Sequence, residues 1–316
     1  MIANIFVCDR SFAFNGTDTI NDLRKKILGM RALFSAIEER RSENVLYLQH
    51  ENFMDTIISK DGDTVGKLIF GTEDEQFQMK QKYSRDVYNL MLSIFKNTQR
   101  SVFSHQEMLE YLTDDFEEKD ACYGIVAMNH LEDLPESKQV LYDEKGFLKF
   151  RRYYIGKLIN DSEEFIDQIE SYYENLILNS NREFFKKKLN EVVESHGVCI
   201  INCLTALSEK FKDEISGKGE IDEVNLSKFL EHFAKSNNLD DGSFEGKNEK
   251  DELNCRFPKT REKGCLETIN LYCGPHLKMY HDDKKKDDRH MRVYFAWDNE
   301  NLDYIYVGMI SSHVKR

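Results

Sequence analysis

The feature that most constrains the fold is the alternation of strand-like runs and polar turns in residues 256–316. The runs LETINLYCGPHLKMYH, RHMRVYFAW and YIYVGMISSHVKR are rich in aromatic and β-branched residues, and DDKKKDD and DNENLD separate them. Short apolar runs divided by turn residues are typical of an antiparallel meander. The sequence therefore predicts a small β-rich unit at this end of the chain.

The preceding part of the chain predicts a mostly helical body with a few strands. Residues 2–7 and 45–48 are short β-branched runs typical of strands, residues 73–112 and 162–212 predict helices, and residues 121–129 predict a buried strand. Apolar residues recur at helical spacing at Leu23, Ile27, Met30, Leu33, Phe34 and Ile37. The predicted fold class is α+β, a mostly helical body followed by a small antiparallel β-rich C-terminal unit.

Residues 237–251 are polar, rich in turn formers and nearly devoid of apolar side chains, which predicts a linker. The predicted division is an acidic α-rich body at 1–236, a linker at 237–251 and a β-rich module at 252–316. Within the body, the strand–helix–strand pattern at 1–70 can form a small α/β unit. It lacks a GxGxxG or Walker-type phosphate loop, so no nucleotide role is expected.

Charge is unevenly distributed along the chain. Residues 256–316 hold 12 Lys+Arg against 9 Asp+Glu, whereas the remaining residues hold 32 against 48, within a net charge of −13. A mildly basic end on an acidic body suits a unit that approaches a polyanion such as RNA. The competing interpretation is an ordinary solvated surface.

Composition excludes several functional classes. No apolar stretch approaches the roughly 18 residues that a membrane span requires, so no membrane partner is expected. The N-terminus has no secretory pattern, and the seven cysteines are odd in number and irregularly spaced, which favours the cytoplasm. Cys255, Cys265 and Cys273 contain no CxxC pair, so neither a metal nor a cofactor is expected.

The C-terminal strands predict a polar site on one face of a sheet. In RHMRVYFAW, alternation places Met291, Val293 and Phe295 on one face and Arg292 on the other. The preceding strand carries His276 and Lys278 on one face, and His313 follows the last strand. We expect these four polar residues to converge on one solvent-accessible surface. The alternative interpretation is a set of surface residues near charged turns.

The same segment resembles the RelE/ParE superfamily of small bacterial toxins. The resemblance rests on a polar strand, a hairpin into R-x-Y-F, and a last strand of the form I-x-V-G-x-I followed by a histidine. It covers about sixty of the 316 residues. It implies a sheet packed on helices and, for the RelE branch, ribosome-dependent cleavage of messenger RNA without a metal. The ParE branch does not cleave RNA.

Carried over by position, the resemblance implies a phosphate-binding role for Arg292, a general acid at His313 and a base at Glu267. Transphosphorylation needs a base, a cation and an acid, and His276 or Glu267, Lys278 with Arg292, and His313 are residues of those types. The expected function is RNA binding or RNA cleavage by a toxin-like protein of bacterial type, with RNA or the ribosome as partner. The alternative is a non-enzymatic interaction protein whose acidic body binds a basic protein partner.

Overall fold

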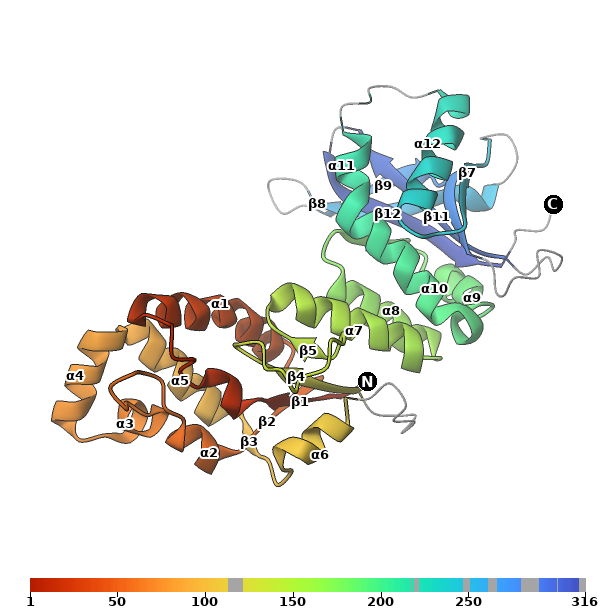
Figure 1. The fold of residues 1–316 in the computed structure, drawn as a ribbon. Coiled ribbons are helices and arrows are strands. Elements are labelled where there is room, and N and C mark those ends of the chain that lie inside the picture. The colour runs from red at the N-terminus through yellow and green to blue at the C-terminus, as the bar shows by residue number, and fades with distance from the viewer. Residues whose placement is uncertain are drawn as a thin grey trace. The chain divides into compact units, whose positions relative to one another are not determined.

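The computed structural model describes residues 1–112, 122–216, 218, 222–246, 251–260, 266–279, 290–299 and 301–312. The chain forms two compact units, Met1–Arg151 and Arg152–Arg316 (Figure 1). Helices predominate over strands, and the C-terminal sheet is largely antiparallel, so the predicted α+β class is confirmed.

The N-terminal unit is built on a parallel sheet of five strands. The strand order is β3-β2-β1-β4-β5, and every neighbouring pair is parallel. The strands are β1 (Ala3–Val7), β2 (Asn44–Leu48), β3 (Gln99–Arg100), β4 (Cys122–Val126) and β5 (Val140–Leu141). Because helices cover both faces of the sheet, β1 is apolar at every position except Asn4 rather than alternating.

Helices cover both faces of this sheet (Figure 1). They are η1 (Asp9–Phe12), α1 (Ile20–Glu39), α2 (His50–Asp55), α3 (Val65–Phe70), α4 (Glu73–Tyr83), α5 (Arg85–Asn97), α6 (His105–Glu110) and the first part of α7 (Glu144–Leu158). Met108 of α6 packs with Phe6 and Ile125 on one face. On the other face, Gly124 leaves room for the ring of Phe150 in α7, which would lie 2.9 Å from a Cβ atom there.

Local sequence explains where the helices begin and end. All six apolar residues predicted for the first helix are buried in α1, and a capping box between Thr19 and Asp22 fixes its start. The helix predicted over 73–112 is instead divided. Ser84 adopts a positive φ of 76° between α4 and α5, and β3 follows α5.

The C-terminal unit is built on a second sheet of five strands, ordered β6-β12-β11-β10-β7. Its strands are β6 (Leu176–Leu178), β7 (Asp241–Phe244), β10 (Pro275–Met279), β11 (Met291–Asp298) and β12 (Asn301–Ser311). Strand β6 is parallel to β12, and the other pairs are antiparallel. Strands β8 (Asn254–Thr260) and β9 (Leu266–Tyr272) form a separate hairpin.

The helices of this unit are α8 (Ser162–Tyr172), α9 (Arg182–Leu189), α10 (Val193–Ala206), the π-helical turn η2 (Leu207–Phe211), α11 (Lys212–Ile215), α12 (Glu223–Ser236) and η3 (Asp251–Leu253). Helices α10 and α12 and the turn η2 pack on one face of the sheet. The β8–β9 hairpin packs on the other face, together with Phe184 of α9 and Leu253 of η3. Phe211 contacts Phe295 of β11 on the helical face, with ring centroids 5.1 Å apart. Tyr294, which precedes Phe295 in β11, points to the opposite face and belongs to a cluster with Phe257 of the hairpin.

The predicted linker is part of this fold rather than a boundary. Residues 241–244 form β7, an edge strand that pairs with β10. Helix α12 lies directly over them. A Cβ atom on Gly242 would be 2.3 Å from the Leu230 carbonyl oxygen, so this position has room only for a glycine. The division of the chain lies at 151/152 instead, and strands β10, β11 and β12 share their sheet with β6 and β7.

Candidate functional site

The C-terminal residues predicted to act together do share one face of the sheet. Lys278 pairs with Arg292, and His276 pairs with Tyr294, across the β10–β11 ladder. Directly opposed residues point to the same side of a sheet. The alternation predicted for these two strands is therefore confirmed for His276, Lys278 and Arg292.

These residues do not form the expected solvent-accessible basic surface. Arg292 is only 7% exposed, and its Nη1 lies 3.0 Å from Glu245 Oε1. Lys278 Nζ lies 2.8 Å from Asp241 Oδ2. Both carboxylates belong to the segment that was predicted to be a linker. The prediction failed because β7 and the residue following it supply the counter-ions that neutralise each cation.

His276 is buried, and both of its ring nitrogens have hydrogen-bond partners. It is 1% exposed, its ring packs 4.8 Å from that of Tyr294, and Nδ1 lies 3.1 Å from the Gly274 carbonyl oxygen. Because a carbonyl only accepts, Nδ1 is the donor. Nε2 of the neutral ring then accepts from Ser243 Oγ at 2.9 Å. Burial lowers the pKa of His276 to about 4, so the ring is neutral near pH 7.

The remaining two predicted residues are placed elsewhere or not described. Glu267 lies in β9, where it pairs with Lys259 in the separate hairpin, and its side chain is outside the described part of the structure. His313 lies outside the described residues. The structure therefore brings together three of the five predicted residues.

A different candidate site lies at the carboxyl ends of β1 and β4 in the N-terminal unit. From β1 the chain runs through α1 to β2 on one side, whereas β4 joins β1 on the other side after α6. In open parallel sheets, ligands bind outside the carboxyl ends of the strands at such a reversal of strand order.

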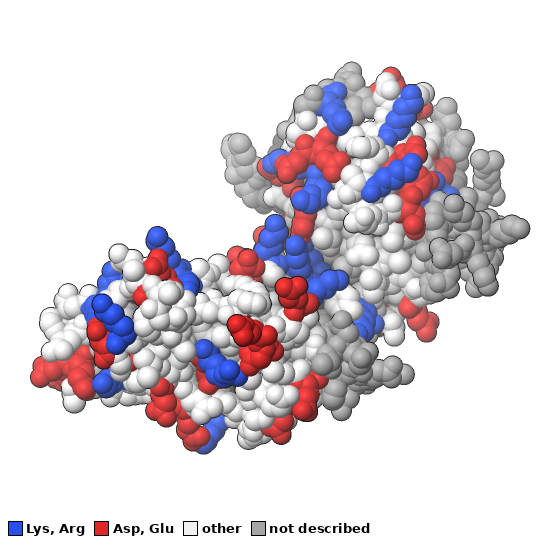
Figure 2. All heavy atoms as spheres, in the orientation of Figure 1, with Lys and Arg blue, Asp and Glu red and all other residues white. Residues whose placement is uncertain are grey.

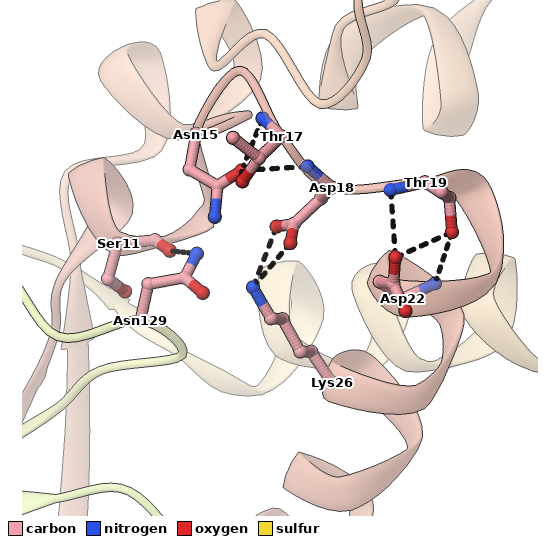
Figure 3. Close-up of polar contacts among 8 residues, drawn as sticks. All are labelled: Ser11, Asn15, Thr17, Asp18, Thr19, Asp22, Lys26 and Asn129. Carbon is pink, nitrogen blue, oxygen red and sulfur yellow. Dashed lines mark hydrogen bonds and ion pairs between the residues drawn. The ribbon is translucent and has the colours of Figure 1, made fainter.

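The turn that follows β1 is held firmly at this position. The Cys8 amide donates to the Val126 carbonyl at 2.9 Å and extends the β1–β4 ladder. Ser11 Oγ accepts from the Met128 amide at 3.0 Å. The Asn129 side-chain amide donates to the Ser11 carbonyl at 2.6 Å (Figure 3). The loops after both strands therefore form one fixed structure.

Four ionisable side chains gather around this turn. His105, at the start of α6, places Nε2 3.0 Å from Asp133 Oδ2, and Arg10 Nη1 lies 2.8 Å from the same oxygen. Asp9 is 4% exposed. Asp9 Oδ1 and His105 Nδ1 are both buried, and neither has a hydrogen-bond partner among the residues that the structure describes. The cluster thus contains two unsatisfied polar atoms.

The two carboxyls of the cluster differ in their electrostatics. Burial raises the pKa of Asp9, although hydrogen bonds from the backbone amides of Arg10 and Asp9 counteract the effect. Burial also opposes ionisation of Asp133, but hydrogen bonds from His105 and Arg10 outweigh it and lower the pKa of that carboxyl. Two carboxyl groups whose pKa values are shifted in opposite directions are typical of sites that need one acid and one base.

The loop between β1 and α1 lines the same region (Figure 3). Asn15 Oδ1 accepts from the amides of Thr17 and Asp18, and Lys26 Nζ lies 2.7 Å from Asp18 Oδ2. The side chain of Asp22 accepts from the Thr19 amide and hydroxyl. Because this capping box places a carboxylate at the start of α1, the helix terminus is poorly suited to a phosphate.

The sequence contained only a weak signal for this site. Asp9 directly follows a predicted strand, but the strand order that brings 126–133 beside it depends on a crossover that periodicity does not reveal. His105 and Asp133 are 28 residues apart.

Acidic and basic side chains are interspersed on the face shown in Figure 2, so no single-sign patch marks a docking surface there. No group of three or more His, Cys, Asp and Glu residues in the described part of the chain is arranged to hold a metal ion. None of the described helices combines the length and apolar character that crossing a bilayer requires. No family model, curated protein or solved structure matches the chain.

Proposed function

We propose that the N-terminal unit binds a small polar molecule at the carboxyl ends of β1 and β4 and catalyses proton transfer on it, most simply a hydrolysis. Asp9 and His105 are the reacting groups. The observation that carries the proposal is the pair of buried atoms, Asp9 Oδ1 and His105 Nδ1, that have no partner among the described residues.

Such atoms are costly to a fold. A buried polar atom left unsatisfied costs about 1–3 kcal/mol, and its presence calls for a ligand, a water or a catalytic role. Here both residues belong to the cluster around the turn after β1, at the edge where parallel sheets bind ligands. A ligand or a substrate water that bonds to both would satisfy them.

The surrounding contacts assign the roles. The Asp133 carboxylate can only accept, so the neutral His105 ring donates through Nε2 and keeps a lone pair on Nδ1, as a general base requires. The raised pKa of Asp9 favours its protonated form, as a general acid requires. His105 would take a proton from water, and Asp9 would give one to the leaving group. Asp133 and Arg10 are positioning residues.

The experiment compares the intact protein with Asp9→Asn and His105→Gln forms in a fractionated extract of small metabolites, followed by mass spectrometry. Arg100→Ala serves as a control because its pair with Glu51 lies on the surface. We expect at least one compound to be consumed by the native and Arg100→Ala proteins and to persist with the other two. Equal consumption by all four proteins, or by none, would refute the proposal.

RNA cleavage by the C-terminal unit is a second candidate. The observation that favours it is the shared face of His276, Lys278 and Arg292. It requires RNA to displace Glu245 and Asp241 from the two cations. The test is RNA integrity in cells that express the intact protein or a Lys278→Gln form. A non-enzymatic interaction protein would leave RNA intact in both cases and show no metabolite turnover.

A further inference from the structure

Two cysteines of the C-terminal unit lie against the same glycine beneath the sheet. Cys255 in β8 is diagonally across the hairpin from Cys273, whose amide donates to the Leu253 carbonyl at 2.8 Å. A Cβ atom on Gly308 of β12 would lie 2.5 Å from Cys273 Sγ and 2.8 Å from Cys255 Sγ. The two sulfurs are therefore close neighbours, and only a glycine leaves room for both.

The two thiols are not equivalent. The hydrogen bond between the two side chains lowers the pKa of Cys255, whose Sγ also lies 3.7 Å from the Gly308 carbonyl oxygen. Burial, together with the same hydrogen bond, raises the pKa of Cys273. Since the thiolate is the reactive form of cysteine, Cys255 is the better nucleophile, and Cys273 is placed to react with it afterwards.

A pocket leads to Cys255. It has a volume of about 710 Å³, and its wall contains Cys255 together with the polar side chains of Asn179, Asn181, Asn254 and Asn270. Cys273 is not among the residues that line it. Because Cys255 is only 2% exposed, a small reagent can use this route whereas a protein thiol cannot.

We propose that Cys255 and Cys273 form a redox modification site in which a small hydroperoxide oxidises the pair to a disulfide. The proposal is independent of the site in the N-terminal unit. The diagonal placement across one hairpin, the shared contact with Gly308 and the pocket at Cys255 carry it together. A dithiol of this kind in a reducing compartment is typically transient and sensing rather than structural.

The reaction balances in two steps. The Cys255 thiolate attacks one peroxide oxygen, the O–O bond breaks, and the leaving oxygen takes a proton to become water or an alcohol. The Cys273 sulfur then attacks the sulfenic sulfur, the S–O bond breaks, and the leaving hydroxide takes the Cys273 thiol proton to become water. The two sulfurs lose two electrons in total and the peroxide gains two.

The test uses the full-length protein with hydrogen peroxide, alkylation of remaining thiols, and digestion with trypsin and a Glu-specific protease. These cuts release Cys255 in residues 253–256 and Cys273 in 268–278, and they separate Cys273 from Cys265. We expect the two peptides to be recovered linked by a disulfide, and separated again after reduction. Cys203 is an internal control because it is fully buried in α10, and we expect it to oxidise at least tenfold more slowly.

Two variants test the order of the steps. In Cys273→Ser, a sulfenic acid should accumulate on Cys255 and be trapped by dimedone. In Cys255→Ser, Cys273 should remain reduced at the same peroxide concentration, and circular dichroism checks that each variant is folded. Oxidation of Cys255 no faster than that of Cys203, or a disulfide from Cys255 to any other cysteine, would overturn the proposal.

Discussion

Asp9 and His276 are both nearly excluded from solvent, and burial shifts their pKa values in opposite directions. Each shift is also a statement about stability, because the folded and unfolded states then bind different numbers of protons. At the residue scale, the buried charged and ionisable groups therefore give the sharpest tests of the structure.

Replacing Asp9 by Asn should stabilise the fold while removing the proposed activity. A carboxyl whose pKa is raised on folding favours the folded state at acid pH, and this contribution is lost as the pH rises through the raised pKa. The gain from Asp9→Asn should therefore grow from pH 4 towards neutrality and reach about 1–3 kcal/mol. Chemical denaturation at several pH values measures it. A gain that shrinks with rising pH would contradict the assignment.

His276 should make the protein acid-sensitive. Its pKa is lowered from 6.5 to about 4, so its contribution to stability is complete above pH 6.5 and is lost as the pH falls through 4. The shift corresponds to about 3 kcal/mol at the acid end. Unfolding curves of the native protein and of His276→Gln should therefore converge as the pH is lowered. His232→Gln, an exposed substitution, should keep the native pH dependence.

Removing Arg292 should destabilise the protein strongly. The substitution Arg292→Ala removes the buried guanidinium that pairs with the half-buried Glu245, and breaking a buried pair typically costs about 3–5 kcal/mol. Arg100→Ala breaks a pair of exposed side chains and should cost about 1 kcal/mol or less. Thermal unfolding of the two variants makes the comparison. Equal melting temperatures would show that Arg292 is free, as a basic surface would require.

At the scale of elements, periodicity predicted much of the fold. The first helix and the alternation in β10 and β11 follow from local pattern. Strands β6 and β7 were missed because they have only three and four residues, and their pairing partners lie far away in the chain. The β1–β4 site was missed for the same reason, since strand order decides which loops meet. The low apolar content of residues 237–251 predicted a linker. It instead reflects an edge strand, β7, whose glycine allows a helix to pack closely over it.

The contact among β8, β9 and β12 depends on Gly308. We expect Gly308→Ala to lower the free energy of unfolding by about 1–3 kcal/mol, the usual cost of overpacking, since its Cβ would overlap both sulfurs. Adding Cys273→Ala removes the closer sulfur and should recover part of the loss. Denaturant unfolding of the two single variants and the double variant forms a mutant cycle. Strictly additive effects would mean that the glycine and the thiol do not compete for space.

At the scale of the whole molecule, the two units have separate cores and separate sheets. The strands of residues 252–316 do not form a unit of their own, because β6 and β7 border the sheet of β10, β11 and β12, and α10 and α12 cover it. Fragments that end at different boundaries should therefore differ in whether they fold.

A fragment of residues 152–316 should fold, whereas residues 252–316 alone should not. The shorter fragment lacks both flanking strands, the Phe211 side chain that packs on Phe295 of β11, and the Phe233 side chain that packs on Phe211. Dispersion of amide signals in NMR spectra distinguishes the two outcomes. A well-dispersed spectrum from the shorter fragment would restore the independent module that the sequence predicted.

The pairing of β6 with β12 also has a consequence during synthesis. Asn179, just after β6, bonds to Gly308 across 129 residues of chain, so β6 emerges from the ribosome long before its partner exists. The N-terminal unit can fold while translation continues. Strand β6 remains unpaired and exposed to other chains until β12 has been synthesised. Its short length of three residues limits how well a neighbouring nascent chain can pair with it.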